Sequence, residues 1–197
     1  MALTDMVIMN GADYQAACDA IRAKTGKTDL IKSGDMAAEI ESIKSGNKLN
    51  DFLKGSIAEI SEEDTKGLTT IKAYRFAYVE GIEKAVFKEL TAIPQNGFYY
   101  TKTVAPDGIL DFHAITSIAA RGFMNGYFHR LIIRTPTVCT LSNVSGFTLS
   151  GSGHYLYVPR ELVENYKNAT NWSSVIGDPN KITEVYAIED YPDICGG

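Results

Sequence analysis

Apolar side chains recur in the middle of the chain as a short phrase with a regular period. In three copies an isoleucine precedes a phenylalanine by five residues, and a fourth copy, Leu141–Phe147, is longer by one residue. The phenylalanines of the four copies are Phe76, Phe98, Phe123 and Phe147, which are 22, 25 and 24 residues apart. Self-similarity at this period is typical of proteins built from repeated supersecondary units. The pattern predicts a repeat region over about residues 57–159.

Compact apolar runs between these copies predict short strands. Ile109–Phe112, Leu131–Ile133 and Tyr155–Val158 are rich in β-branched and aromatic residues and are framed by Gly, Pro and Asn. One unit of this size cannot bury its own Ile and Phe, so the neighbouring units must cover them. Two architectures fit the pattern, a ladder of coils and an ordinary β-sandwich with chance periodicity. The recurrence of the phrase favours the ladder.

The first 48 residues have a helical pattern and lack the repeated phrase. Two short amphipathic helices are predicted, at about 13–24 and 33–43. Their apolar stripes form a candidate anchoring face of seven residues: Tyr14, Ala17, Cys18, Ile21, Met36, Ile40 and Ile43. Two such helices cannot make much of a core alone, so the stripes either cap the first repeat or dock on another protein. A DNA-binding helix-turn-helix is disfavoured, because the loop is long and the second helix is acidic.

The segments that flank the repeat region have their own patterns. Residues 45–54 are polar and rich in turn formers, which predicts a linker. After Pro159, apolar residues at helical spacing predict a helix, and Trp172 follows as a residue that closes the end of the core beside Tyr166. Ile182–Ile188 alternates apolar and polar side chains, as a closing edge strand does. Residues 160–197 are therefore predicted to form a C-terminal cap.

Composition and charge exclude several classes of protein. The chain has 197 residues, of which 45% are hydrophobic and 22% charged, as in an ordinary globular protein. A formal net charge of −5 argues against a nucleic-acid partner. No apolar run reaches 18 residues, so no membrane insertion is expected, and the first residues lack the basic and apolar regions of a secretory signal.

The cysteines and histidines form no recognisable metal or catalytic motif. Cys18, Cys139 and Cys195 are too far apart for a disulfide framework or a metal site. Cys139 is predicted to be a buried hydrophobe, and Cys195 an exposed thiol. The three histidines stand alone, and no nucleophile elbow, P-loop or dinucleotide fingerprint occurs. No catalytic, cofactor-binding or metal-binding residue is therefore predicted.

One catalytic arrangement stays open, because a pair of carboxylates that cleaves glycans assembles only in space. The carboxylates available for it in the repeat region include Glu80, Asp107 and Asp111.

Aromatic residues beside turns suggest a contact surface. The candidates are Tyr99, Tyr100, Tyr127 and Phe128. Exposed tyrosines are common in contact surfaces, since a rigid ring supplies area at low entropic cost. These rings either stack on a cell-surface sugar or pack between the repeats, and the second reading is preferred.

The repeated phrase resembles the BspA-type leucine-rich repeat in a degenerate form. Three longer tracts, 14–36, 131–143 and 156–173, resemble tail-associated structural proteins of phages and prophages of Gram-positive bacteria. The resemblance implies an α+β fold with a short N-terminal helical segment, a small leucine-rich-repeat-like β-solenoid and a C-terminal capping helix. The domains would be 1–48 and 49–197.

The resemblance also implies a function, a non-enzymatic structural component of a phage particle in its tail, baseplate or fibre. The N-terminal helices would anchor the protein to other virion proteins, and the repeats would face neighbours or a host-surface glycan or protein. Localisation would be the virion, assembled in the host bacterial cytoplasm, and the protein would form a homo-oligomer, as particle proteins usually do. The alternatives are a cell-wall glycan-acting enzyme with a repeat scaffold, a head decoration protein and a bacterial surface adhesin.

Overall fold

The computed structural model describes residues 48–196. The chain divides into two compact units, Met1–Lys48 and Leu49–Gly197. All seven residues of the predicted anchoring face, Tyr14, Ala17, Cys18, Ile21, Met36, Ile40 and Ile43, lie outside the described residues. In what the structure describes, no helix is both long and apolar enough to cross a membrane.

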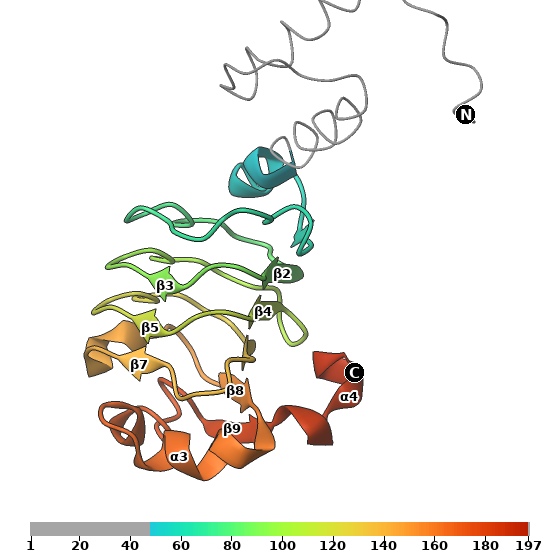
Figure 1. Ribbon diagram of the computed structural model, residues 1–197. Coiled ribbons are helices and arrows are strands. Elements are labelled where there is room, and N and C mark those ends of the chain that lie inside the picture. The colour runs from blue at the N-terminus through green and yellow to red at the C-terminus, as the bar shows by residue number, and fades with distance from the viewer. Residues whose placement is uncertain (1–47, 197) are drawn as a thin grey trace, which may run out of the picture. The chain divides into compact units, whose positions relative to one another are not determined.

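The second unit contains two parallel sheets, whose strands are stacked along two sides of the chain in Figure 1. The large sheet has six strands in the order β1-β2-β4-β6-β8-β9, and the small sheet has three in the order β3-β5-β7. The strands of the large sheet are β1 (Glu59–Ile60), β2 (Lys84–Phe87), β4 (Ile109–Phe112), β6 (Arg130–Ile133), β8 (Tyr155–Val158) and β9 (Glu184–Ala187). Those of the small sheet are β3 (Ala92–Ile93), β5 (Ser117–Ile118) and β7 (Thr140–Leu141).

The repeated phrase sets the register of both sheets. Each strand pairs with its counterpart in the next copy, as in Phe87 with Phe112 in the large sheet and Ile93 with Ile118 in the small one. Because each copy brings the chain back in the same direction, every strand pairing described is parallel. In the second and third copies the isoleucine of the phrase, Ile93 or Ile118, is therefore a strand residue, and the phenylalanine lies in the turn that follows.

The expected α+β class with a leucine-rich-repeat-like β-solenoid is wrong. The described chain is a mostly parallel-sheet α/β fold with few helices. Two features depart from a regular coil. The small sheet has only three two-residue strands, and the connection from β8 to β9 contains helix α3 (Val163–Asn168) instead of another copy of the phrase.

The phenylalanines of the phrase share one interior, as predicted. Phe76, Phe98, Phe123 and Phe147 are at most 1% exposed. Neighbouring rings in this series have centroids 4.9, 5.3 and 5.2 Å apart. Burying one such side chain stabilises the fold by about 1.5–3 kcal/mol. This column of rings, together with backbone hydrogen bonds such as Phe98 N–H to Gly122 O at 2.9 Å, holds the turns of successive copies over one another.

The column extends past the repeats at both ends. Phe52 is fully buried and its ring lies 6.4 Å from that of Phe76. Residues 48–53 are helical, so the predicted linker over 45–54 is wrong for its described part. At the other end Trp172, in η5 (Trp172–Ser174), lies 5.2 Å from Phe147 and 5.0 Å from Tyr166, which confirms the prediction for this tryptophan.

Two of the three cysteines are described, and both are buried. Cys139 accepts a hydrogen bond from Trp172 Nε1 at its carbonyl, 2.6 Å, and donates one from its N–H to the Tyr166 hydroxyl, 2.9 Å. Burial raises the pKa of the Cys139 thiol to about 12, as expected for an inert core residue. Cys195 is 5% exposed, so the predicted exposed thiol is wrong. It lies in the short helix α4 (Pro192–Cys195), which folds back beside the large sheet.

Candidate functional site

The turns that follow the small sheet have an unusual backbone. In the first three copies, the residues two before and two after the buried phenylalanine have positive φ values of 55–62°. These six left-handed positions are Tyr74, Tyr78, Asn96, Tyr100, Arg121 and Asn125. Hydrogen bonds from one turn to the next fix this conformation. Tyr74 N–H donates to Asn96 O at 3.1 Å, Tyr78 N–H to Tyr99 O at 2.9 Å and Tyr100 N–H to Met124 O at 3.0 Å.

Tyrosine is a costly choice at such positions. Left-handed backbone favours Gly and Asn, and a bulky residue there costs of order 1–3 kcal/mol. Asn96 and Asn125 show that asparagine fits the same turns. The fold therefore does not require tyrosine at 74, 78 and 100.

Four tyrosines gather on this side of the molecule, and we call them the tyrosine edge: Tyr74, Tyr78, Tyr99 and Tyr100. Tyr78 and Tyr100 are stacked, with centroids 5.6 Å apart and planes 13° apart. The ring of Tyr99 lies edge-on to the other three, at 5.9 Å from Tyr74, 5.7 Å from Tyr78 and 4.7 Å from Tyr100. Asn96 Nδ2 donates a hydrogen bond to the Tyr74 hydroxyl at 2.8 Å, and this bond helps to hold the Tyr74 ring in place.

These rings are open to solvent, unlike the aromatic core behind them. Tyr74, Tyr78 and Tyr100 are 55%, 65% and 36% exposed, and they are the large hydrophobic side chains found exposed in the described part of the chain. A preordered cluster of this kind offers contact area without first having to be organised.

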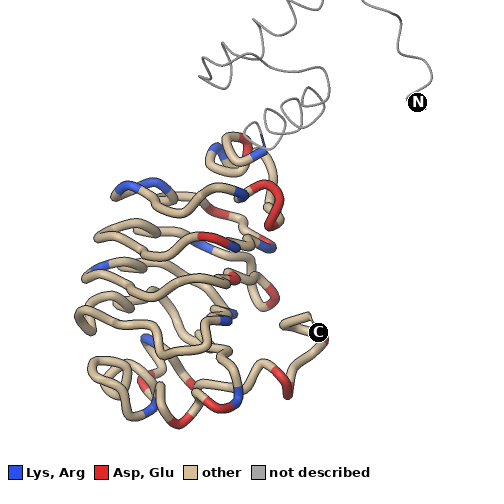
Figure 2. Tube along the Cα trace, in the orientation of Figure 1, with Lys and Arg blue, Asp and Glu red and all other residues tan. Residues whose placement is uncertain are grey.

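The charges at the tyrosine edge are all positive. The four turn segments 69–79, 92–101, 117–126 and 140–149 contain Lys72, Arg75 and Arg121 but neither Asp nor Glu. All three side chains are exposed, and Figure 2 shows blue without red along this side of the repeats. The acidic residue nearest to these turns in sequence is Glu80, two residues after Tyr78, and it pairs with Lys102 at 2.6 Å. A chain of net charge −5 therefore carries a local cationic and aromatic surface.

The four predicted contact residues are divided by the structure. Tyr99 and Tyr100 belong to the tyrosine edge. Tyr127 lies apart from it and is half-buried, with its hydroxyl 2.7 Å from His129 Nε2. Phe128 is 1% exposed and packs against Phe123, so its prediction as a surface residue is wrong. Neighbouring side chains in an extended segment point to opposite sides, and Phe128 takes the inner one.

The sequence prediction missed Tyr74 and Tyr78. The signal was available in the repeat itself, because Tyr78 follows Phe76 by two residues just as Tyr100 follows Phe98. Tyr99 and Tyr100 are adjacent in the sequence, whereas Tyr78 is related to Tyr100 only by its equivalent position in another copy. Equivalent positions are the ones that the parallel register brings together.

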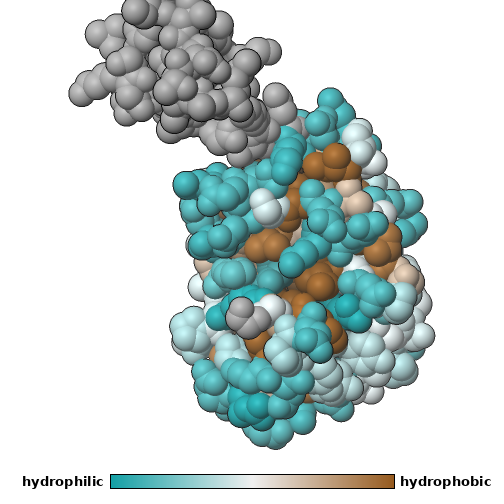
Figure 3. Space-filling model, turned by 90° about the vertical axis from the view of Figure 1, so that its right-hand side faces the viewer, coloured by the Kyte–Doolittle hydropathy of each residue, from teal (hydrophilic) through white to brown (hydrophobic). Residues whose placement is uncertain are grey.

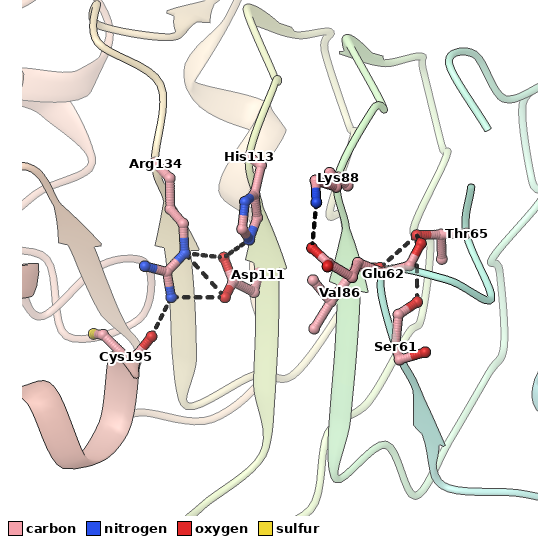
Figure 4. A network of polar contacts seen from close by, with 9 residues as sticks. All are labelled: Ser61, Glu62, Thr65, Val86, Lys88, Asp111, His113, Arg134 and Cys195. Atoms are coloured by element: carbon pink, nitrogen blue, oxygen red, sulfur yellow. Dashed lines mark hydrogen bonds and ion pairs between the residues drawn. The ribbon is translucent and has the colours of Figure 1, made fainter. Parts of the chain in front are cut away.

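A second polar cluster lies on the outer face of the large sheet, the face seen in Figure 3. Apolar side chains there, including Ile132, Tyr157 and Cys195, lie among hydrophilic ones. Figure 4 shows Asp111 on β4 gripped by the Arg134 guanidinium, with Nε–Oδ1 and Nη2–Oδ2 distances of 2.9 Å each. His113 Nε2 lies 3.5 Å from Asp111 Oδ1.

Electrostatics and connectivity give this cluster a structural character. Burial alone would raise the pKa of Asp111, but hydrogen bonds from His113 and Arg134 and the Arg134 charge outweigh it and hold the pKa below its ordinary value. Arg134 Nη2 also donates to the Cys195 carbonyl and so fastens α4 to the sheet. An ionised carboxylate held by a bidentate arginine is a weak proton acceptor.

The carboxylates left open for glycan cleavage are each engaged by a cation. Glu80 pairs with Lys102, Asp107 with Arg130 at 2.8 Å, and Asp111 with Arg134. Among residues 48–196, no group of three His, Cys, Asp or Glu side chains could hold a metal ion. The tyrosine edge is accordingly the best candidate site.

Comparison with known proteins adds no relative. No protein-family model, curated protein or solved structure matches the chain. Function is therefore inferred from the residues described above and from the resemblance of the three sequence tracts.

Proposed function

We propose that this protein is a non-enzymatic structural component of a phage particle, in the tail, baseplate or fibre, and that the tyrosine edge is its contact surface. The observation that carries the contact role is the placement of Tyr74, Tyr78 and Tyr100. They occupy left-handed positions at an energetic cost while their rings stay exposed. The resemblance of tracts 14–36, 131–143 and 156–173 supports the phage assignment.

A contact role explains the features that the fold does not require. Exposed tyrosines supply rigid apolar area with a polar tip, and they are enriched where binding energy is concentrated. The turn-to-turn hydrogen bonds keep the rings in place before any partner arrives. Strain held at one surface by an otherwise regular scaffold is a common mark of function.

The proposal assigns the two units different tasks. The N-terminal unit would attach the protein to other virion proteins, and the second unit would present the tyrosine edge to a neighbour or to the host surface. Assembly would take place in the host bacterial cytoplasm, with the protein then carried in the virion as a homo-oligomer.

A census of purified virions tests the phage assignment. Mass spectrometry of gradient-purified particles should detect the chain at a fixed copy number, and cryo-EM should place it on the particle. Its absence from particles, with the same protein abundant in the infected cell, would overturn the assignment.

The contact role is tested in the same particles. Virions with the double substitution Tyr78→Asn and Tyr100→Asn should assemble normally but attach to host cells, or to the neighbouring virion protein, at least tenfold more weakly. Asparagine suits the left-handed backbone, so the turns should stay intact. The matched control is Lys167→Gln on α3, which changes a partly exposed side chain distant in sequence from these turns. Unchanged attachment and assembly in the double variant would contradict a contact role.

A further inference from the structure

We propose that the tyrosine edge binds an anionic polysaccharide, with the rings stacking on sugar faces and the flanking cations pairing with its carboxylate or phosphate groups. This inference rests on the proposed contact role and adds the chemical class of the ligand.

The ring geometry suits a sugar polymer. Tyr78 and Tyr100 are stacked on each other and both are exposed, so the face of each ring that is turned away from the other is the one that a sugar would cover. The apolar C–H faces of pyranose rings pack on such aromatic faces, while the phenolic hydroxyls reach the sugar hydroxyls. Tyr74 also contacts Tyr99, with ring centroids 5.9 Å apart, so the aromatic surface includes more than one exposed ring. The surface is therefore longer than one sugar residue and suits a chain.

The charges around the rings suit an anion. Arg75 stands between two tyrosine positions, at the place in the phrase where later copies have Gly97, Gly122 and Gly146. Arg121 takes the left-handed position that Tyr74 and Asn96 occupy in the two preceding turns. Both side chains are exposed, and no ion pair joins either to another described residue. Arginine forms bidentate pairs with carboxylate and phosphate, so two free guanidinium groups and Lys72 add selectivity for acidic sugars.

The charge density favours a glycan over a nucleic acid. The turns that carry the rings contain three exposed cations, and the chain as a whole carries a net charge of −5. Duplex DNA has one negative charge per about 1.7 Å of its axis, and a binding protein usually matches many phosphates. A polysaccharide with at most one acidic group per sugar unit has its charges farther apart than duplex DNA does. This wider spacing suits a site with only a few cations.

Binding of the full-length protein to defined polymers tests the inference. Polygalacturonate supplies carboxylates on sugar rings, phosphorylated dextran supplies phosphates on sugar rings, dextran is the neutral polymer, and oligo(dT) represents nucleic acid. Biolayer interferometry at low and moderate salt should show binding to at least one anionic polymer, at least tenfold tighter than to dextran and oligo(dT) and weakened by salt. The polymer that binds better identifies the charged group.

Two double variants separate the parts of the site. Tyr78→Asn with Tyr100→Asn should weaken polymer binding at least tenfold at either salt concentration. Arg75→Gln with Arg121→Gln should weaken it about as much and flatten the salt dependence. Lys167→Gln, which removes a partly exposed cation from another part of the chain, should leave it unchanged. Circular dichroism and thermal unfolding should match the wild type in each case.

Several results would overturn the inference. They are equal binding to dextran, tighter binding to oligo(dT), no binding to either anionic polymer by the folded wild type, and unchanged binding in both double variants. The outcome is separable from that of the proposed function. Virions whose attachment depends on Tyr78 and Tyr100, from a protein that binds no polymer, would retain the contact role and point to a protein partner.

Discussion

At the scale of single residues, position within the repeat decides what a side chain does. Phe98 and Tyr100 are two residues apart in one turn, yet one is 1% and the other 36% exposed. The difference arises because the left-handed residue at the end of the turn directs its side chain away from the core. Asparagine at the equivalent position of the next copy, Asn125, shows that the exposed place tolerates a small polar residue. The stability of the fold should therefore depend little on which ring stands there.

We expect Tyr78→Asn to change the free energy of unfolding by less than about 1 kcal/mol. Loss of the contacts with Tyr99 and Tyr100 costs roughly 0.5–1.5 kcal/mol per pair, and relief of the left-handed strain returns a similar amount. Urea unfolding followed by circular dichroism measures the difference.

Tyr78→Val is the matched control, since it removes the same ring but puts a β-branched residue in left-handed backbone. It should be about 1 kcal/mol less stable than Tyr78→Asn. Equal stabilities would show that backbone strain at this position is negligible. The strain would then no longer be a reason to regard the tyrosine as functional.

At the scale of elements, the C-terminal helix α4 is held on the large sheet by contacts that do not belong to the repeated phrase. Helix α4 is only four residues long and cannot be stable alone. It is held by Arg134, which bridges the Asp111 carboxylate and the Cys195 carbonyl, and by the packing of Cys195 near Ile132 and Tyr157. One carboxylate on β4 therefore controls the position of the C-terminal end.

We expect Asp111→Asn to destabilise the protein by roughly 3 kcal/mol, because it leaves the partly buried Arg134 without its counter-ion. Amide hydrogen exchange of residues 191–196 should accelerate, since α4 loses its fastening. Asp107→Asn is the matched control. It removes the same charge from an aspartate paired with an arginine, but Asp107 is 70% exposed, so the cost should stay below about 1 kcal/mol. Equal costs for the two variants would contradict a structural role for the buried pair.

At the scale of the whole molecule, stability should depend on pH through buried groups. His154 is fully buried, its Nδ1 donates to the Phe128 carbonyl at 2.5 Å, and its Nε2 has no hydrogen-bond partner. Burial lowers the pKa of His154, against the opposing effect of the Phe128 carbonyl, and the nearby His129 lowers it further. The folded protein therefore holds this imidazole neutral at a pH where the unfolded chain takes up a proton.

The sign of the pH effect follows from that difference. The unfolded histidine binds its proton near pH 6.5, so the stability is fully present above that value and falls as the pH drops from about 7 towards the lower folded pKa. The lowered pKa of Asp111 adds a second loss in stronger acid, below the ordinary aspartate value of about 3.9.

We expect the midpoint of thermal unfolding to be nearly constant from pH 8 to 7 and to fall from pH 7 to 5. His154→Gln should unfold at a lower temperature at pH 7.5 but lose most of the slope between pH 7 and 5. Differential scanning calorimetry across this range measures both. An identical slope in the variant would assign the effect to other groups.

The sequence by itself determined the local pattern of this protein. The spacing of Phe76, Phe98, Phe123 and Phe147 indicated a shared interior, and the runs 109–112 and 155–158 coincide with β4 and β8. Ile182–Ile188 contains the edge strand β9. These predictions succeed because burial of an apolar side chain and the period of a repeat are properties of the chain itself.

The tertiary structure decided the rest. Strand β2 was missed because only three of its four residues are apolar, and it pairs with two neighbours in the sheet, β1 and β4. The fold class depended on the direction of pairing, which no single repeat specifies. The tyrosine edge is likewise a product of parallel register, which places residues 22 or more positions apart side by side. The sequence specifies the residue types of this surface, but only the pairing of successive turns brings them together into one surface.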